Sequence, residues 1–138
     1  MRFPKRERLK SRKLLDLAFA HGGEKPLKAW PILMKIVPAD LPEKVPTQTA
    51  FSAAKRKFPR AVDRNAIKRH MREAWRHERG PLESALRERG VQWAIVLIFV
   101  GQEIPDAERC RKAVGKLVGK ALTALENGNQ PKETSKER

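Results

Sequence analysis

The 138-residue chain contains one cysteine, Cys110, and no tyrosine. A single cysteine excludes an internal disulfide and a zinc site built from several cysteines, and it fits a reducing compartment. The longest apolar run, residues 91–100, is broken by Gln92 and is about half as long as a membrane-spanning helix. Charges interrupt the apolar residues that follow the basic N-terminus, so no secretory signal is expected. The sequence therefore predicts a soluble, cytoplasmic protein without a membrane partner.

Acidic residues are also scarce, because 16 Asp and Glu stand against 31 Lys and Arg, which gives a formal net charge of +15. The excess is concentrated in two segments. Residues 1–13 carry a net charge of +6 and residues 55–79 a net charge of +7, which leaves +2 for the rest of the chain. Charge gathered in this way predicts a polyanionic partner, and nucleic acid is favoured over an anionic membrane or an acidic protein. Repulsion within residues 1–13 leaves open whether this basic arm is ordered without its partner.

Residues 63–79 have the periodicity of a helix with two different faces. One face carries a basic side chain at every fourth position: Arg64, Lys68, Arg72 and Arg76. The neighbouring face carries the apolar side chains Ile67, Met71, Ala74 and Trp75. Like charges at this spacing destabilise a helix by about 0.2–0.5 kcal/mol per pair, which an external polyanion would offset. We expect Asp63 to cap this helix and Gly80–Pro81 to end it.

The rest of the chain alternates between predicted helices and strands. Helices are expected over residues 10–20, with Ser11 as cap and Gly22–Gly23 as stop, and over 82–89 and 106–125. Strands are expected over residues 29–37, 47–54 and 93–100, and the last, which is apolar without alternation, should be central in the sheet. Residues 1–125 are predicted to form one domain. Residues 126–138 lack apolar side chains and are predicted to be a disordered tail.

An active site made by the protein alone is not expected. The three histidines are scattered, and no cysteine or paired carboxylate accompanies them in a metal-ligand pattern. A phosphate-binding glycine loop and a Gly-x-Ser-x-Gly elbow are also missing. We therefore predict neither a catalytic residue nor a metal ligand among the side chains.

Residues 50–76, AFSAAKRKFPRAVDRNAIKRHMREAWR, closely resemble the signature segment of the bacterial ribonuclease P protein family. The matching positions are Arg64, Asn65, Lys68, Arg69, Arg72 and Glu73, preceded by Phe51–Ser52 and the basic residues 55–57. The segment ERLKSRKLLDLAFAHGG resembles the N-terminal helix of the family, and the late strand and last helix stand where the family has them. The resemblance covers roughly residues 5–125.

The resemblance implies an α+β fold, a single compact α-β-β-β-α-β-α sandwich with a central sheet and a left-handed β-α-β crossover, similar to domain 2 of ribosomal protein S5. It also implies that the protein joins ribonuclease P RNA in a ribonucleoprotein that removes the 5′ leader of precursor tRNA. In this endonuclease the RNA would carry out the hydrolysis, and the Mg²⁺ ions would be held chiefly by the RNA. No obligate protein partner is implied.

Two sets of site residues follow from the resemblance. The RNA-binding set is Lys55, Arg56, Lys57, Arg64, Asn65, Lys68, Arg69, Arg72 and Arg76. The set for a cleft that receives the precursor-tRNA leader is Arg8, Leu15, Phe19 and Phe51. The guanidinium fork of Arg suits phosphate, and aromatic faces stack on unpaired bases. Without tyrosine, such stacking must come from Phe, Trp or Arg.

Two departures from the family pattern bear on these sets. Ala66 stands where an Arg commonly follows the Asn, which predicts a weakened peripheral contact. Leu15 stands where the family often has a second phenylalanine. Of the tryptophans, Trp30 is a candidate for the sheet face, whereas Trp75 and Trp93 are expected in the core. The alternative reading is another RNA-binding protein, such as a ribosome-associated factor of similar fold, and a helix-turn-helix DNA reader fits less well.

Overall fold

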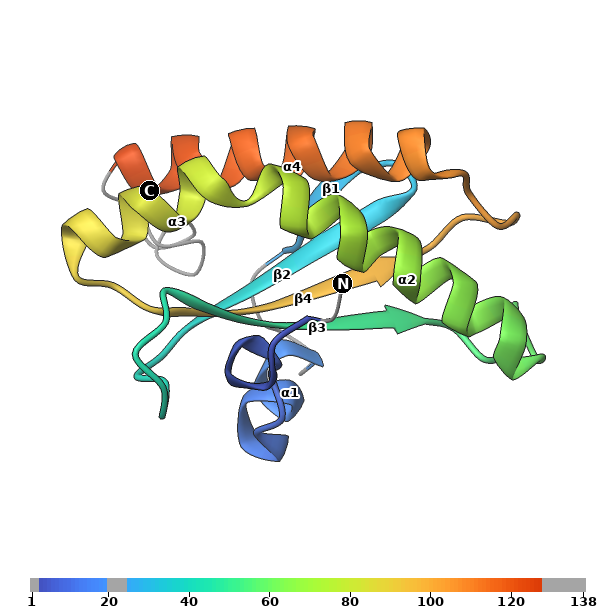
Figure 1. The fold of residues 1–138 in the computed structure, drawn as a ribbon, viewed down its shortest axis with the longest axis horizontal. Coiled ribbons are helices and arrows are strands. Elements are labelled where there is room, and N and C mark those ends of the chain that lie inside the picture. Colours follow the sequence, from blue (N-terminus) through green and yellow to red (C-terminus); the bar gives the residue numbers. More distant parts are fainter. Residues whose placement is uncertain (1–2, 20–24, 128–138) are drawn as a thin grey trace.

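The structure, a computed structural model, describes residues 3–19 and 25–127 (Figure 1). Its elements are the 3-10 helix η1 (Lys5–Glu7), α1 (Arg12–Phe19), β1 (Leu27–Ala29), β2 (Ile32–Pro38), β3 (Thr47–Ala53), α2 (Ala61–Glu78), α3 (Gly80–Arg89), β4 (Trp93–Phe99) and α4 (Ala107–Glu126). This is the α+β order that the family resemblance implies, with α3 added after the basic helix. Within the described ranges, no helix is long and apolar enough to cross a membrane.

The four strands form one sheet in the order β1-β2-β4-β3. β4 lies between β2, to which it is antiparallel, and β3, to which it is parallel. This confirms the prediction that the apolar strand is central. Because β3 and β4 are parallel neighbours, the chain must cross over between them, and α2 and α3 make up that crossover (Figure 1).

Each face of the sheet has its own apolar cluster, as the alternation of side chains along a strand requires. On one face, Trp93, Ile95 and Leu97 of β4 pack with α2 and α4. On the other face, Ala94 and Val96 pack with α1 and with the loop before β3. Figure 1 shows α2 and α4 on one side of the sheet and α1 on the other. The sheet is therefore the middle layer of a three-layer arrangement.

The prediction of one strand over residues 29–37 was wrong. The chain turns at Trp30–Pro31, and β1 and β2 form an antiparallel hairpin on either side of this turn. The Trp30–Pro31 peptide bond is cis. Proline has no N–H to donate to a strand ladder, but its carbonyl oxygen is used, since it accepts a hydrogen bond from the Val100 N–H at 2.8 Å. Trp30 consequently lies at a turn, with 62% of its surface exposed.

The helix ends were predicted in part. Ser11 caps α1 as expected, because its Oγ accepts a hydrogen bond from the Leu14 N–H at 3.2 Å. Asp63 does not cap α2, because the helix begins two residues earlier and Arg60 occupies the cap position without a side-chain hydrogen bond. Asp63 instead lies in the first turn, where its charge suits the helix dipole and pairs with Arg60 at 3.7 Å.

The remaining boundaries agree with the sequence to within a few residues. α2 ends at Glu78, and α3 follows after a single residue, with Pro81 in its first turn as helix geometry favours. α4 extends to Glu126, one residue into the predicted tail. The glycine pair 22–23 and the rest of the predicted tail, residues 128–138, lie outside the described residues.

Candidate nucleic-acid interface

Helix α2 has the two faces that its sequence predicts. The apolar residues Ile67, Met71, Ala74 and Trp75 are completely buried against the sheet and α4. Lys68 and Arg72 are half-buried, and Arg69 and Asn65 are exposed. The burial of the apolar stripe fixes the rotation of the helix, so the basic stripe must lie at the surface.

A groove of about 650 Å³ runs between α2, β3 and the N-terminal segment, which we define as residues 3–10. We call it the α2 groove. Its basic lining residues are Arg8, Lys10, Lys68, Arg69 and Arg72, and its other lining residues are Phe3, Leu9, Thr49, Ala50, Phe51 and Glu73. Five cations against one carboxylate give the groove the electrostatics of a polyanion site.

Phe51 forms part of this groove and is itself braced by its neighbours. The guanidinium carbon of Arg72 lies 5.7 Å from the centre of the Phe51 ring, in cation–π range. Phe51 also packs edge to face against the ring of Phe3, with 5.6 Å between the ring centres. The groove therefore combines an aromatic ring with cations, which is the combination that binds unpaired nucleotides.

Arg64, in the first turns of α2, also stabilises the loop that precedes this helix. Its Nη1 donates hydrogen bonds to the carbonyl oxygens of Phe58 at 2.8 Å and Pro59 at 2.9 Å. These bonds hold the end of the loop that carries the basic residues 55–57. The three loop residues are exposed, and the Lys57 Nζ donates to the carbonyl oxygen of Val100 at 3.1 Å.

Arg76 lies at the far end of the basic stripe, where its Nη2 meets Glu73 Oε1 at 3.2 Å. Glu73 is thus the partner of Arg76 and lies at the groove as well. The charge of Arg76 is therefore partly neutralised within the helix.

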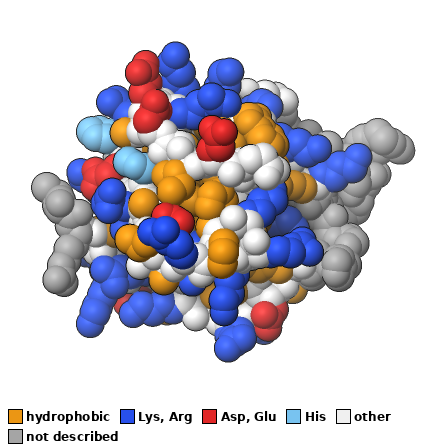
Figure 2. Space-filling view, turned by 90° about the vertical axis from the view of Figure 1, so that its right-hand side faces the viewer, with side chains coloured by type: hydrophobic (Ala, Val, Ile, Leu, Met, Phe, Trp, Pro, Cys, Tyr) orange, Lys and Arg blue, Asp and Glu red, His pale blue; other side chains and the backbone are white. Residues whose placement is uncertain are grey.

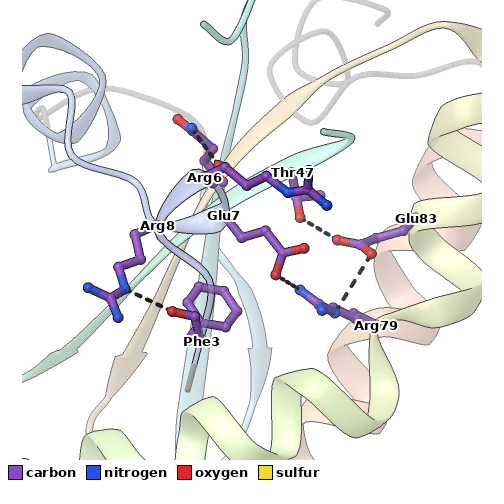
Figure 3. A network of polar contacts seen from close by, with 8 residues as sticks. Phe3, Arg6, Glu7, Arg8, Thr47, Arg79 and Glu83 are labelled. Atoms are coloured by element: carbon purple, nitrogen blue, oxygen red, sulfur yellow. Dashed lines mark hydrogen bonds and ion pairs between the residues drawn. The ribbon is translucent and has the colours of Figure 1, made fainter. Parts of the chain in front are cut away.

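Arg79 is a residue whose role the sequence did not reveal (Figure 3). Its Nη1 donates to Glu7 Oε1 at 2.8 Å, and its Nε lies 3.7 Å from Glu83 Oε1. Glu83 in turn accepts a hydrogen bond from the Thr47 hydroxyl at 2.7 Å. The Arg79 guanidinium also lies over the Phe3 ring at 5.6 Å. The network joins the α2–α3 junction to β3 and to the N-terminal segment.

The four residues predicted for a leader cleft are not brought together. Arg8 and Phe51 line the α2 groove. Leu15 and Phe19 are on α1, and Leu15 packs with the apolar cluster on the opposite face of the sheet. Phe19 has 47% of its surface exposed. If Phe19 and Phe51 both contact RNA, they do so on different sides of the sheet.

The other tryptophans follow the prediction, because Trp75 and Trp93 are fully buried. Trp30 is exposed and borders a hollow of about 360 Å³ with Pro31, Gly101 and Ile104. Figure 2 views the end of the molecule that is on the right in Figure 1, and it shows Lys and Arg side chains around a central group of hydrophobic ones. In residues 3–19 and 25–127, no three His, Cys, Asp or Glu side chains are grouped to hold a metal ion.

The fold and the α2 groove define a small α+β protein with a strongly basic groove on its surface. The chain belongs to the ribonuclease P protein family, because a family model described as Ribonuclease P matches residues 3–122. Among the matching proteins, the ribonuclease P protein component of Chlorobaculum tepidum is 30% identical over 129 residues, which are 87% of this chain and 82% of that one. This membership agrees with the resemblance found in the signature segment.

A second relative matches more strongly over a shorter stretch. The ribonuclease P protein component of Porphyromonas gingivalis is 40% identical over 65 residues, so the match spans about half the length of either chain, 47% of each. Among solved structures, the RNase P protein of Staphylococcus aureus superposes with a TM-score of 0.57. It is 16% identical and covers 83% of this chain and 94% of its own, which supports the fold.

Proposed function

We propose that this chain is the protein subunit of a bacterial ribonuclease P, in which it binds the RNA subunit and precursor tRNA and promotes removal of the 5′ leader. The family membership supports this proposal, and the α2 groove is the observation that carries it. Its five basic residues and the Phe51 ring provide phosphate and base contacts in one place.

In this proposal the protein is part of an endoribonuclease without supplying catalytic groups. The RNA subunit would carry out the hydrolysis, and the Mg²⁺ ions would be held chiefly by that RNA. The protein would add binding energy for the RNA subunit and for precursor tRNA. Cations on the protein lessen phosphate repulsion, so the protein should matter most when magnesium is low. It would act in the bacterial cytoplasm without an obligate protein partner.

The RNA-subunit contact is assigned to α2 and the loop before it. Lys68, Arg69 and Arg72 border the groove, whereas Arg64 supports the loop with residues 55–57. Asn65 is exposed beside them, with one donor and one acceptor group for RNA. Ala66 is half-buried at this edge, so a missing cation there would remove only a peripheral contact.

The test is reconstitution with a bacterial ribonuclease P RNA and precursor tRNA at low magnesium, with leader removal followed over time. We expect faster cleavage and tighter precursor binding with the protein than with RNA alone, and no cleavage by the protein alone. Replacing Lys68, Arg69 and Arg72 by Ala should remove most of the stimulation. The matched control, R87A/R89A/K112A, deletes the same residue types from exposed positions of α3 and α4.

A folded protein that gives no stimulation at any magnesium level, with a matched RNA subunit, would rule the proposal out. If it still binds RNA through the α2 groove, the ribosome-associated alternative takes its place. Equal losses in the groove variant and the control would mean that total charge matters and the groove does not.

A further inference from the structure

A second basic groove lies beside the N-terminal segment, and none of the residues predicted on α2 belongs to it. It has a volume of about 440 Å³, and Lys5, Arg6, Arg8 and Lys10 line it together with Gln48 and the loop before β3. One carboxylate, Glu43, is in the lining. We call it the arm groove. The four cations repel one another in so small a space, and one carboxylate is too little to neutralise them, so the groove favours an external anion.

The two grooves share Arg8 and Lys10, which line both. Beyond this shared part the grooves follow different stretches of β3. Thr49, Ala50 and Phe51 border the α2 groove, whereas Gln48, earlier on the strand, borders the arm groove. A ligand that fills both grooves must therefore pass over the N-terminal segment at Arg8 and Lys10.

The N-terminal segment is held firmly at this crossing. The Leu9 N–H donates to the carbonyl oxygen of Thr49 at 3.0 Å, and the Gln48 side chain donates to the carbonyl oxygen of Arg6 at 2.8 Å. Glu7 is anchored to Arg79 from the other side (Figure 3). The backbone of the segment and the Glu7 carboxylate thus provide the anchors, so the backbone that carries the cations is in place before a ligand arrives.

We propose that the two grooves form one continuous track for a single RNA strand, which crosses the N-terminal segment at Arg8 and Lys10. This inference rests on the proposed function, because it takes the ligand of the α2 groove to be RNA. A duplex is too stiff to follow two small grooves that join at the N-terminal segment, whereas a single strand bends and presents one phosphate per nucleotide. Lys5 and Arg6 contact the phosphates beyond the crossing.

The test measures binding of a uridine oligonucleotide of about 16 nucleotides to the full chain as a function of salt concentration. K5A/R6A alters only the arm groove, and K68A/R69A alters only the α2 groove. The control, K112A/K116A, removes two charges from exposed positions of α4. Each groove variant should lower the slope of log Kd against log salt by about 1.4, which is two phosphate contacts at about 0.7 each.

The control should leave the slope unchanged, and K5R/R6K, which keeps both charges, should restore it. One strand should bind per protein. The Lys5 and Arg6 side chains are exposed, and the hydrogen bond to Arg6 uses a backbone oxygen, so K5A/R6A should fold normally, which thermal unfolding checks.

Each other outcome has a definite meaning. If K68A/R69A lowers the slope and K5A/R6A does not, the continuous track is wrong and the proposed function stands. If neither lowers it, a single strand does not bind in either groove and the continuous track is wrong, while the reconstitution with ribonuclease P RNA decides the proposed function separately. Two strands per protein would mean two separate sites. Equal competition by oligoglutamate of the same charge would mean that the track accepts any flexible polyanion, which would overturn its assignment to RNA.

Discussion

The guanidinium of Arg64 donates a hydrogen bond to the carbonyl oxygen of Phe58 at 2.8 Å, and so ties the first turns of α2 to the loop that precedes it. Arg64 was predicted from the sequence as an RNA contact. Its Nη1 donates both hydrogen bonds within the protein, so in the proposed complex a phosphate would be bound by Nε and Nη2. Replacing Arg64 therefore affects the folded protein as well as the complex, unlike replacing its neighbours on the basic stripe.

We expect Arg64→Ala to lower the free energy of unfolding by about 1 kcal/mol, because two carbonyl oxygens lose a charged donor near the surface. Lys68→Ala should change it by less than about 0.5 kcal/mol, as is usual for a surface substitution. Urea denaturation of the two variants measures the difference. Equal stability of both would mean that the Arg64 hydrogen bonds contribute nothing to the fold.

Arg72 allows charge and shape to be separated. Arg72→Lys keeps the cation but loses the planar group that stacks on Phe51. We expect the salt slope of binding to ribonuclease P RNA to stay the same while Kd rises several-fold. Arg72→Ala should raise Kd further and lower the slope by about 0.7–0.9. If Lys and Ala at this position behave identically, charge is not what Arg72 supplies.

Phe19 offers a test of the leader contact with little risk to folding. Since 47% of its surface is exposed, Phe19→Ala should leave stability almost unchanged. It should weaken binding of precursor tRNA by about 1–3 kcal/mol if one base stacks on the ring, and leave mature tRNA unaffected. Leu17→Ala, on the same helix and 52% exposed, is the matched control. Equal loss for both tRNAs would count against a leader contact at α1.

The Glu7–Arg79 pair should be important for stability, because both side chains are less than one-fifth exposed. Glu7→Gln removes the charge at constant size and should cost about 1.5 kcal/mol of unfolding free energy. Glu88→Gln, at an exposed position of α3, should cost almost nothing. Chemical denaturation measures the free energy of unfolding of the two variants. The same loss in both would show that the Glu7–Arg79 pair adds no more stability than hydration of the two side chains does.

Cys110 should be inert in the folded protein. Burial in the core, and to a lesser degree the charge of Asp106, raises the pKa of its thiol to about 11. A maleimide should therefore label the native chain slowly at pH 8 and the urea-unfolded chain rapidly. Between about pH 9 and about 11 the native state keeps a proton that the unfolded state has lost, so stability should fall with rising pH there and be unaffected by this group below it. Rapid labelling of the native chain would contradict this.

The basic helix could be predicted because its apolar and its basic residues both recur at helical spacing within one short segment. Four apolar residues at helical spacing determine which side of α2 is buried, and the basic residues between them follow from that. The hairpin at Trp30–Pro31 could not be predicted in the same way, because the residues on either side of the turn are both suited to strands. What distinguishes two strands from one is their antiparallel pairing, which begins with Ala29 opposite Ile32.

The candidate site was predicted as two lists of residues but not as a surface. Phe51 of β3 points to the face of the sheet that α2 and α4 cover, whereas α1 with Leu15 covers the opposite face, and the sequence does not show on which face α1 packs. The role of Arg79 could not be predicted either, because its partner Glu7 lies 72 residues away and appears in the sequence as part of a basic arm. Contacts between distant segments depend on the register of the whole sheet.

The attachment of residues 3–10 to β3 also bears on how the protein behaves at high concentration. β3 and β1 are the two edge strands of the sheet, and an open edge invites a strand from another molecule. At the β3 edge the Leu9 N–H donates a hydrogen bond to the Thr49 carbonyl oxygen, and at the other edge β1 spans only three residues. A segment rich in positive charge thus closes the longer edge, and copies of the protein that meet there repel one another instead of joining their sheets.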